Sequence, residues 1–138
     1  MILVDAGPLI ALIDRGEQDH IRCVEALADL TTPMVTTWPA FTEAMYLLGS
    51  AGGWKGQAAL WKLLERGDLQ LVALDEALQK RTQALMGKYR DTPMDLADAS
   101  LVAAAEALDT SRVFTLDSDF EIYRWKGRRK FEVVPGPL

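Results

Sequence analysis

Four carboxylates that lie far apart along the chain have sequence contexts that predict a reactive site. They are Asp5, Glu43, Asp98 and Asp117. Asp5 follows the apolar run 2–4 and Asp117 follows a second apolar run, 113–116, so both are expected where a strand ends. Glu43 and Asp98 are expected on the apolar faces of helices. Because a domain rarely directs acids at its own core without a cation to neutralise them, the set predicts a divalent-metal site.

The two helical acids carry most of this argument. Glu43 has Ala40 three residues before it and Leu47 four residues after it, which predicts that it lies on the apolar side of its helix. Asp98 has apolar residues three, four and seven positions later. An unpaired carboxylate at such a position would be costly or would stay protonated. A salt bridge to a buried arginine is the alternative, but few arginines occur in apolar contexts here, so we favour the metal.

The other acids each have a structural alternative. Asp5 and Asp117 suit the capping of a helix or a turn, which is a common role for aspartate. The segment 92–95 has the form of a capping box, which would explain Asp95 without chemistry. Asp95 is also one turn from Asp98, so it remains a candidate to support the metal ligands. Three residues near the end of the run 113–116 are candidates for the same supporting role: Thr115, Ser118 and Asp119.

The donor types indicate which metal and which reaction the site would serve. Oxygen ligands without cysteine or paired histidine suit Mg²⁺ or Mn²⁺, and we expect Asp5, Asp98 and Asp117 to be the direct ligands. Such a site clamps phosphate oxygens and orients a water for in-line attack, which is the chemistry of phosphodiester hydrolysis. Cys23 is the only cysteine, which excludes an internal disulfide and a thiolate zinc cluster.

The elements that must position these acids alternate along the chain in a way typical of an α/β fold with a parallel sheet. Strands are predicted at 2–4, 34–37, 69–74, 113–116 and 131–134. A helix is predicted with Pro8 in its first turn, and further helices are predicted at 19–30, from Pro39, at 54–66, at 77–88 and from Thr92 to Leu108, with a break at 49–53. The acids converge only if the first and fourth strands are neighbours. A sheet ordered 3-2-1-4-5 achieves this and creates a crevice at its switch point.

Bulk properties limit the classes of protein to consider. The length of 138 residues predicts one domain spanning 1–138. No apolar run reaches bilayer-spanning length and the first residues lack the pattern of a signal peptide, so we expect a cytoplasmic protein without membrane association. The formal net charge of −5 counts against a nucleic-acid partner but does not exclude one, because several acids would belong to the metal site.

Two further features have alternative interpretations. Five basic residues fall within the segment 124–130, interleaved with aromatic residues. This segment is either a solvated turn around Gly127 or an edge that contacts phosphate. The chain also has four tryptophans, most of which we expect in the core, with one or two marking a partner surface.

Several of these motifs together resemble the PIN-domain ribonucleases, particularly the toxins of VapBC-type toxin–antitoxin modules. The motifs are the opening Ile2-Leu3-Val4-Asp5, Glu43 in a Pro-started helix, the segment 94–101 and the segment 114–120. The resemblance implies a three-layer α/β/α PIN-like domain and an Mg²⁺-dependent endoribonuclease. Its catalytic acids would be Asp5, Glu43, Asp98 and Asp117. It also implies an RNA substrate, a homodimer and a small antitoxin partner that inhibits the toxin.

Two alternative functions are weighed against this one. Many family members have a Ser or Thr shortly after the first Asp, whereas this chain has Ala6-Gly7-Pro8. That departure favours a catalytically weak or inactive PIN-like module that acts through partner binding, although all four acids are retained. A phospho-acceptor signalling domain would need adjacent acids after the first strand and a lysine after a late strand, and neither occurs here.

Overall fold

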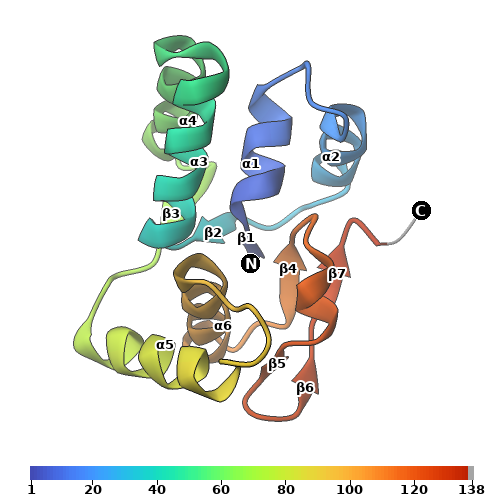
Figure 1. Ribbon diagram of the computed structural model, residues 1–138. Coiled ribbons are helices and arrows are strands. Elements are labelled where there is room, and N and C mark those ends of the chain that lie inside the picture. Colours follow the sequence, from blue (N-terminus) through green and yellow to red (C-terminus); the bar gives the residue numbers. More distant parts are fainter. Residues whose placement is uncertain (137–138) are drawn as a thin grey trace.

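The sheet of the computed structural model has the strand order predicted from the sequence. The structure describes residues 1–136, so positions 137–138 of the predicted domain lie outside the described residues. Five parallel strands are ordered β3-β2-β1-β4-β7, and β7 is the predicted fifth strand (Figure 1). They span Ile2–Val4 (β1), Met34–Thr36 (β2), Leu69–Leu71 (β3), Arg112–Phe114 (β4) and Glu132–Val134 (β7). β1 and β4 are therefore neighbours, as convergence of the acids requires.

Helices cover both faces of this sheet and form a three-layer structure (Figure 1). They span Ala6–Ile13 (α1), His20–Ala28 (α2), Trp38–Gly52 (α3), Trp54–Arg66 (α4), Glu76–Lys88 (α5) and Leu96–Leu108 (α6). Ile2 and Val4 pack with apolar residues of α1 to α4, whereas Leu3 packs with residues of α5 and α6. All three are fully buried, which explains why β1 is apolar throughout.

Two predicted helix boundaries are wrong. The predicted break at 49–53 is not a turn, because α3 continues to Gly52 and only Gly53, at φ +73°, separates it from α4. The N–H of Gly53 donates to the carbonyl of Gly49, so this small-residue segment keeps its helical bonds. The capping box at 92–95 is also absent. Asp95 is itself the N-cap and accepts from the N–H of Asp98 at 2.8 Å, so α6 begins at Leu96.

The segment after β4 contains elements that the sequence analysis did not predict. Ser118–Glu121 forms a 3₁₀ helix (η1), and Arg124–Trp125 (β5) pairs antiparallel with Arg129–Lys130 (β6). Lys126 and Gly127, both at positive φ, lie in the turn that joins these two strands. The hairpin packs beside the C-terminal end of α6, where the N–H of Lys126 donates to Glu106 at 2.6 Å. Its basic residues therefore flank the end of α6 that is remote from Asp98.

The expectation that most tryptophans lie in the core is wrong. Trp38, Trp54 and Trp61 are 42%, 69% and 39% exposed, and only Trp125 is buried. Phe41 occupies the core position on α3, and the rings of Trp38 and Trp61 pack edge-on against it at centroid distances of 5.7 and 5.2 Å. α3 and α4 thus carry exposed aromatic surface. No helix within residues 1–136 is both long enough and apolar enough to cross a bilayer.

Candidate metal centre

Asp5 lies directly after β1, where its side chain is buried and held by two hydrogen bonds. It is the N-cap of α1, and its Oδ1 accepts from the N–H of Ala6 at 2.8 Å. Its Oδ2 accepts from the hydroxyl of Thr115 at 2.9 Å. Burial raises the pKa of Asp5, and these hydrogen bonds oppose that rise only in part. The predicted capping role is therefore confirmed, and it coexists with a carboxylate held in the crevice.

Asp117 reaches the same crevice from the end of β4. Its N–H donates to the hydroxyl of Thr115 at 3.0 Å, and its Oδ1 accepts from the N–H of Asp119 at 2.9 Å, which caps η1. The Thr115 hydroxyl is therefore bonded to both acidic positions. β4 pairs in parallel with β1 through Val4 and Phe114, so the two strands end side by side. This pairing is what brings Asp5 and Asp117 together.

Asp98 enters the crevice from the first turn of α6 and is 6% exposed. The Tyr123 hydroxyl lies 3.2 Å from its Oδ2 and donates to it. Burial raises the pKa of Asp98 to about 7, and the negative charges of Asp95, Asp5 and Asp117 add to the rise. Asp98 lies in a buried part of α6, as predicted, but the burial is not limited to one face of the helix, because residues 97–105 are all buried.

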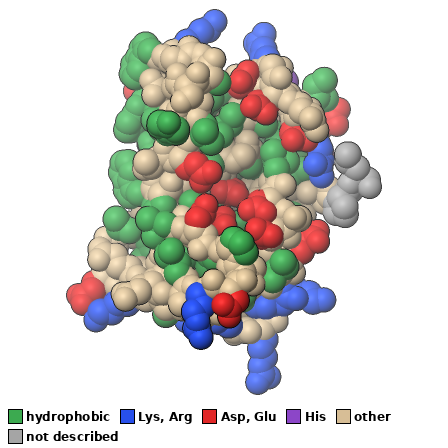
Figure 2. Space-filling view, in the orientation of Figure 1, with side chains coloured by type: hydrophobic (Ala, Val, Ile, Leu, Met, Phe, Trp, Pro, Cys, Tyr) green, Lys and Arg blue, Asp and Glu red, His purple; other side chains and the backbone are tan. Residues whose placement is uncertain are grey.

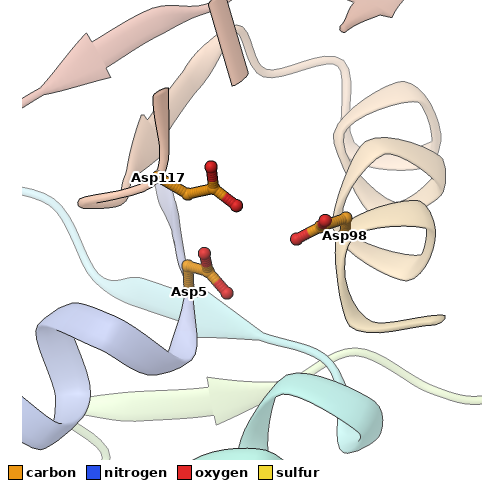
Figure 3. A group of neighbouring side chains, drawn as sticks. All are labelled: Asp5, Asp98 and Asp117. Atoms are coloured by element: carbon orange, nitrogen blue, oxygen red, sulfur yellow. The ribbon is translucent and has the colours of Figure 1, made fainter. Parts of the chain in front are cut away.

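These three aspartates form a cluster with the composition of a hard-cation site. Each offers one carboxylate oxygen, and the three oxygens lie within 4.8 Å of one another (Figure 3). No lysine or arginine among residues 1–136 forms a salt bridge with any of them. Figure 2 shows Asp and Glu side chains gathered near the middle of the face into which the crevice opens. Clustered oxygen donors without a protein cation fit Mg²⁺ or Mn²⁺.

Glu43 is placed differently from the sequence prediction. Its side chain is exposed, and it is not one of the three clustered acids. The buried face of α3 is formed by residues 40, 41, 44 and 48, so position 43 falls at the edge of that face. Partial burial and the charges of Asp5, Asp95 and Asp117 nevertheless raise the pKa of Glu43. Glu43 therefore lies outside the cluster but close enough for the charges of Asp5 and Asp117 to act on its carboxyl group.

The predicted supporting residues are not equivalent. Thr115 is buried and touches the cluster directly, whereas Ser118 is exposed. Asp119 contributes its backbone N–H to Asp117, and Asp95 caps the helix that carries Asp98. Tyr123, which also contacts the cluster, is not among the predicted site residues, because it is 25 positions from Asp98 and no local motif marks it.

A family model confirms the class of protein that this fold and site define. The model of the PIN domain matches residues 2–126, and the chain belongs to that family. The resemblance to VapC-type PIN-domain toxins that the sequence motifs predicted is confirmed.

Three relatives illustrate the similarity. The chain is 27% identical over 135 residues to ribonuclease VapC26 of Mycobacterium tuberculosis, covering 97% of this chain and 100% of that protein. VapC20 of Mycobacterium tuberculosis, described as a sarcin–ricin loop cleaving toxin, superposes with a TM-score of 0.82 at 16% identity, covering 88% and 94% of the two chains. A toxin–antitoxin complex from Klebsiella pneumoniae gives a TM-score of 0.67 at 20% identity, covering 87% and 90%. The two structural matches show the shared fold.

Proposed function

We propose that this protein is a Mg²⁺-dependent endoribonuclease and the toxin of a type II toxin–antitoxin pair. The observation that carries the proposal is the convergence of Asp5, Asp98 and Asp117 without a neutralising side chain among the described residues. The family, and the similarity to a protein named as a ribonuclease, support RNA as the substrate.

The residues divide into two roles in this proposal. Asp5, Asp98 and Asp117 hold the metal, and the exposed carboxylate of Glu43 is accessible to water and to RNA. A carboxylate with a raised pKa is suited to accept a proton from a water and pass it on. A bound Mg²⁺ would supply charge neutralisation at phosphate oxygens and polarise the attacking water.

The alternative of an inactive module is weakened by one contact. That alternative was motivated by the absence of a hydroxyl residue shortly after Asp5. The Thr115 hydroxyl donates a hydrogen bond to Oδ2 of Asp5 from just beyond the end of β4. Thr115 can thus orient the Asp5 carboxylate as a Ser or Thr shortly after Asp5 would. This contact favours an active enzyme.

We also propose that an antitoxin protein and a second copy of the chain cover apolar surface. On α4, Trp54 and Trp61 line a groove of about 630 Å³ together with the charged residues Lys55, Lys62 and Glu65. A separate apolar hollow of about 470 Å³ between α5 and α6 includes the exposed Leu74 and Leu96. Exposed apolar patches of this kind mark interaction sites. Light scattering of the isolated chain tests whether it forms a dimer. Co-purification with the product of an adjacent reading frame tests whether it binds an antitoxin.

Cleavage assays with matched variants test the enzymatic proposal. The purified chain should cut structured RNA in Mg²⁺ or Mn²⁺ and not in EDTA, and a sarcin–ricin loop hairpin is a reasoned first substrate because VapC20 is described as cutting it. Asp5→Asn and Asp117→Asn should reduce cleavage to background. Asp75→Asn, which alters the N-cap of α5 instead, serves as the control and should remain active. Equal cleavage by all of these variants would refute the assignment.

A further inference from the structure

We infer that Tyr123 is a positioning residue for the metal centre: its hydroxyl holds one oxygen of Asp98 so that the other oxygen is presented to the cation. The inference rests on the metal site proposed above. Tyr123 lies outside the acidic motifs, and its hydroxyl would influence which metal the site prefers.

The polar contacts of Tyr123 are few and specific. Its side chain is fully buried, and its hydroxyl lies 3.2 Å from Oδ2 of Asp98 and 3.0 Å from the carbonyl of Pro93. The single hydroxyl proton is shared between these two acceptors. Because Pro93 precedes α6 and Asp98 lies in its first turn, the hydroxyl links the Asp98 side chain to the backbone that leads into its own helix.

The ring of Tyr123 is held by two other aromatic rings. It packs edge-on against Phe120 at 5.3 Å and against Tyr89 at 5.3 Å, with interplanar angles of 82° and 71°. Phe120 belongs to η1, the short helix capped by Asp117. The segment 117–123 therefore supplies one metal ligand and restrains a second. A phenylalanine would preserve both ring contacts, so the hydroxyl is needed only for its bonds to Asp98 and Pro93.

This arrangement has a consequence for metal selection. Mg²⁺ requires nearly ideal octahedral geometry at short distances, whereas Ca²⁺ accepts a carboxylate through both oxygens and tolerates varied geometry. An oxygen that accepts a hydrogen bond from a fixed hydroxyl is less available for two-oxygen ligation. Tyr123 should therefore favour Mg²⁺ and Mn²⁺ over Ca²⁺ at this site.

The test compares two tyrosine variants of the full chain. Tyr123→Phe removes the hydroxyl that donates to Asp98. Tyr89→Phe removes a hydroxyl from the same aromatic stack, and among the described residues that hydroxyl bonds only to the N–H of Arg124. We expect Tyr123→Phe to bind Mn²⁺, measured by electron paramagnetic resonance of the free ion, about 10- to 100-fold more weakly than the parent. When Mg²⁺ or Ca²⁺ competes with Mn²⁺, the ratio of Mg²⁺ affinity to Ca²⁺ affinity should be smaller for Tyr123→Phe than for the parent. Tyr89→Phe should match the parent in both measurements.

A measurement on the parent chain covers the case in which Tyr123→Phe fails to fold. In a Mg²⁺ titration followed by ¹³C NMR, the Tyr123 Cζ and Asp98 Cγ signals should move with one common midpoint while Tyr89 Cζ stays in place. An unmoved Tyr123 signal, or a Tyr123→Phe variant with parental affinity and selectivity, would overturn the inference. If the parent binds no Mn²⁺, both the metal site and the role of Tyr123 are wrong. This outcome differs from failure of the Tyr123 role alone, because the Asp98 Cγ signal would also fail to respond to Mg²⁺.

Discussion

Thr115 donates a hydrogen bond from Oγ1 to Oδ2 of Asp5 across 2.9 Å, although the two residues are 110 positions apart in the chain. The same hydroxyl accepts from the N–H of Asp117 at 3.0 Å. Through this hydroxyl, the ends of β1 and β4 are joined at the point where two acids of the cluster lie. The contact restrains the orientation of the Asp5 carboxylate before any cation binds.

Thr115→Val should therefore weaken metal binding. Valine keeps the shape of the side chain but removes the donor to Asp5, and loss of a contact that orients a ligand typically costs about 10- to 100-fold in affinity. Titration calorimetry with Mn²⁺ measures this loss. Thr36→Val is the matched control, because the Thr36 hydroxyl is equally buried but donates to the carbonyl of Val4 and not to a carboxylate. It should lose about 1 kcal/mol of stability and keep its metal affinity. Equal metal affinities in the two variants would contradict the orienting role.

Asp98→Asn should separate a metal ligand from a structural acid. Without metal, close carboxylate pairs repel by about 1 to 4 kcal/mol at 4 Å, depending on the local dielectric. Because Asp98→Asn removes one of these charges, the variant should melt in EDTA at the parental temperature or above it. It should also lose the stabilisation that Mg²⁺ confers on the parent by mass action. Thermal denaturation with and without metal measures both effects. A large loss of stability in EDTA with an intact metal response would remove Asp98 from the ligand set.

The stability of the metal-free protein should fall as the pH rises toward neutrality. The pKa of Asp98 is about 7 in the folded state and 3.8 for an unperturbed side chain, so between these values the folded state holds the extra proton. The contribution of Asp98 to the free energy of unfolding is thus fully present below about pH 4 and is lost as the pH rises through 7. Melting curves in EDTA from pH 5 to pH 8 measure the slope, which Asp98→Asn should flatten. A parental melting temperature that rises with pH would contradict this sign.

The products of cleavage should identify the nucleophile. If a water attacks phosphorus, the ribose 2′-hydroxyl is not needed and no 2′,3′-cyclic phosphate forms. An RNA with a single 2′-deoxy nucleotide at the scissile position should therefore be cut as well as the unmodified RNA. Mass spectrometry of the products should find 5′-phosphate and 3′-hydroxyl ends. A cyclic phosphate, or an uncut deoxy-substituted RNA, would exclude this mechanism.

The basic hairpin gives a prediction about RNA affinity. Arg128 lies in the turn between β5 and β6, Arg129 begins β6, and both side chains are exposed. Figure 2 shows Lys and Arg side chains that project from the lower edge of the molecule. If Arg128 and Arg129 contact phosphate, replacing both with alanine should reduce the slope of log affinity against log salt by roughly one unit per lost contact. Lys80→Ala, on the exposed face of α5 and paired with Glu76, is the control. An unchanged slope in the double variant would indicate a solvated turn.

Local sequence patterns were sufficient to predict the sheet and three of its acids. The apolar run before Asp5 is a fully buried strand, and the run before Asp117 starts with the two buried residues that end β4. The apolar spacing after Asp98 falls within the buried part of α6. Such patterns can be read locally, because the side chains on one face of a helix or a strand recur at the fixed spacing of that element. The strand order followed from requiring that these acids meet, and the parallel pairing of β1 with β4 confirms it.

Tertiary packing decided what the local patterns could not. The exposure of Glu43 and of three tryptophans depends on how far α3 and α4 rotate against their neighbours, and a helical period does not specify that rotation. The start of α6 at Leu96 depends on which side chain captures the N–H of Asp98. The contacts of Thr115 with Asp5 and of Tyr123 with Asp98 join residues 110 and 25 positions apart. They form only once strand register and helix packing have fixed the distance between their atoms, so no spacing in the sequence predicts them.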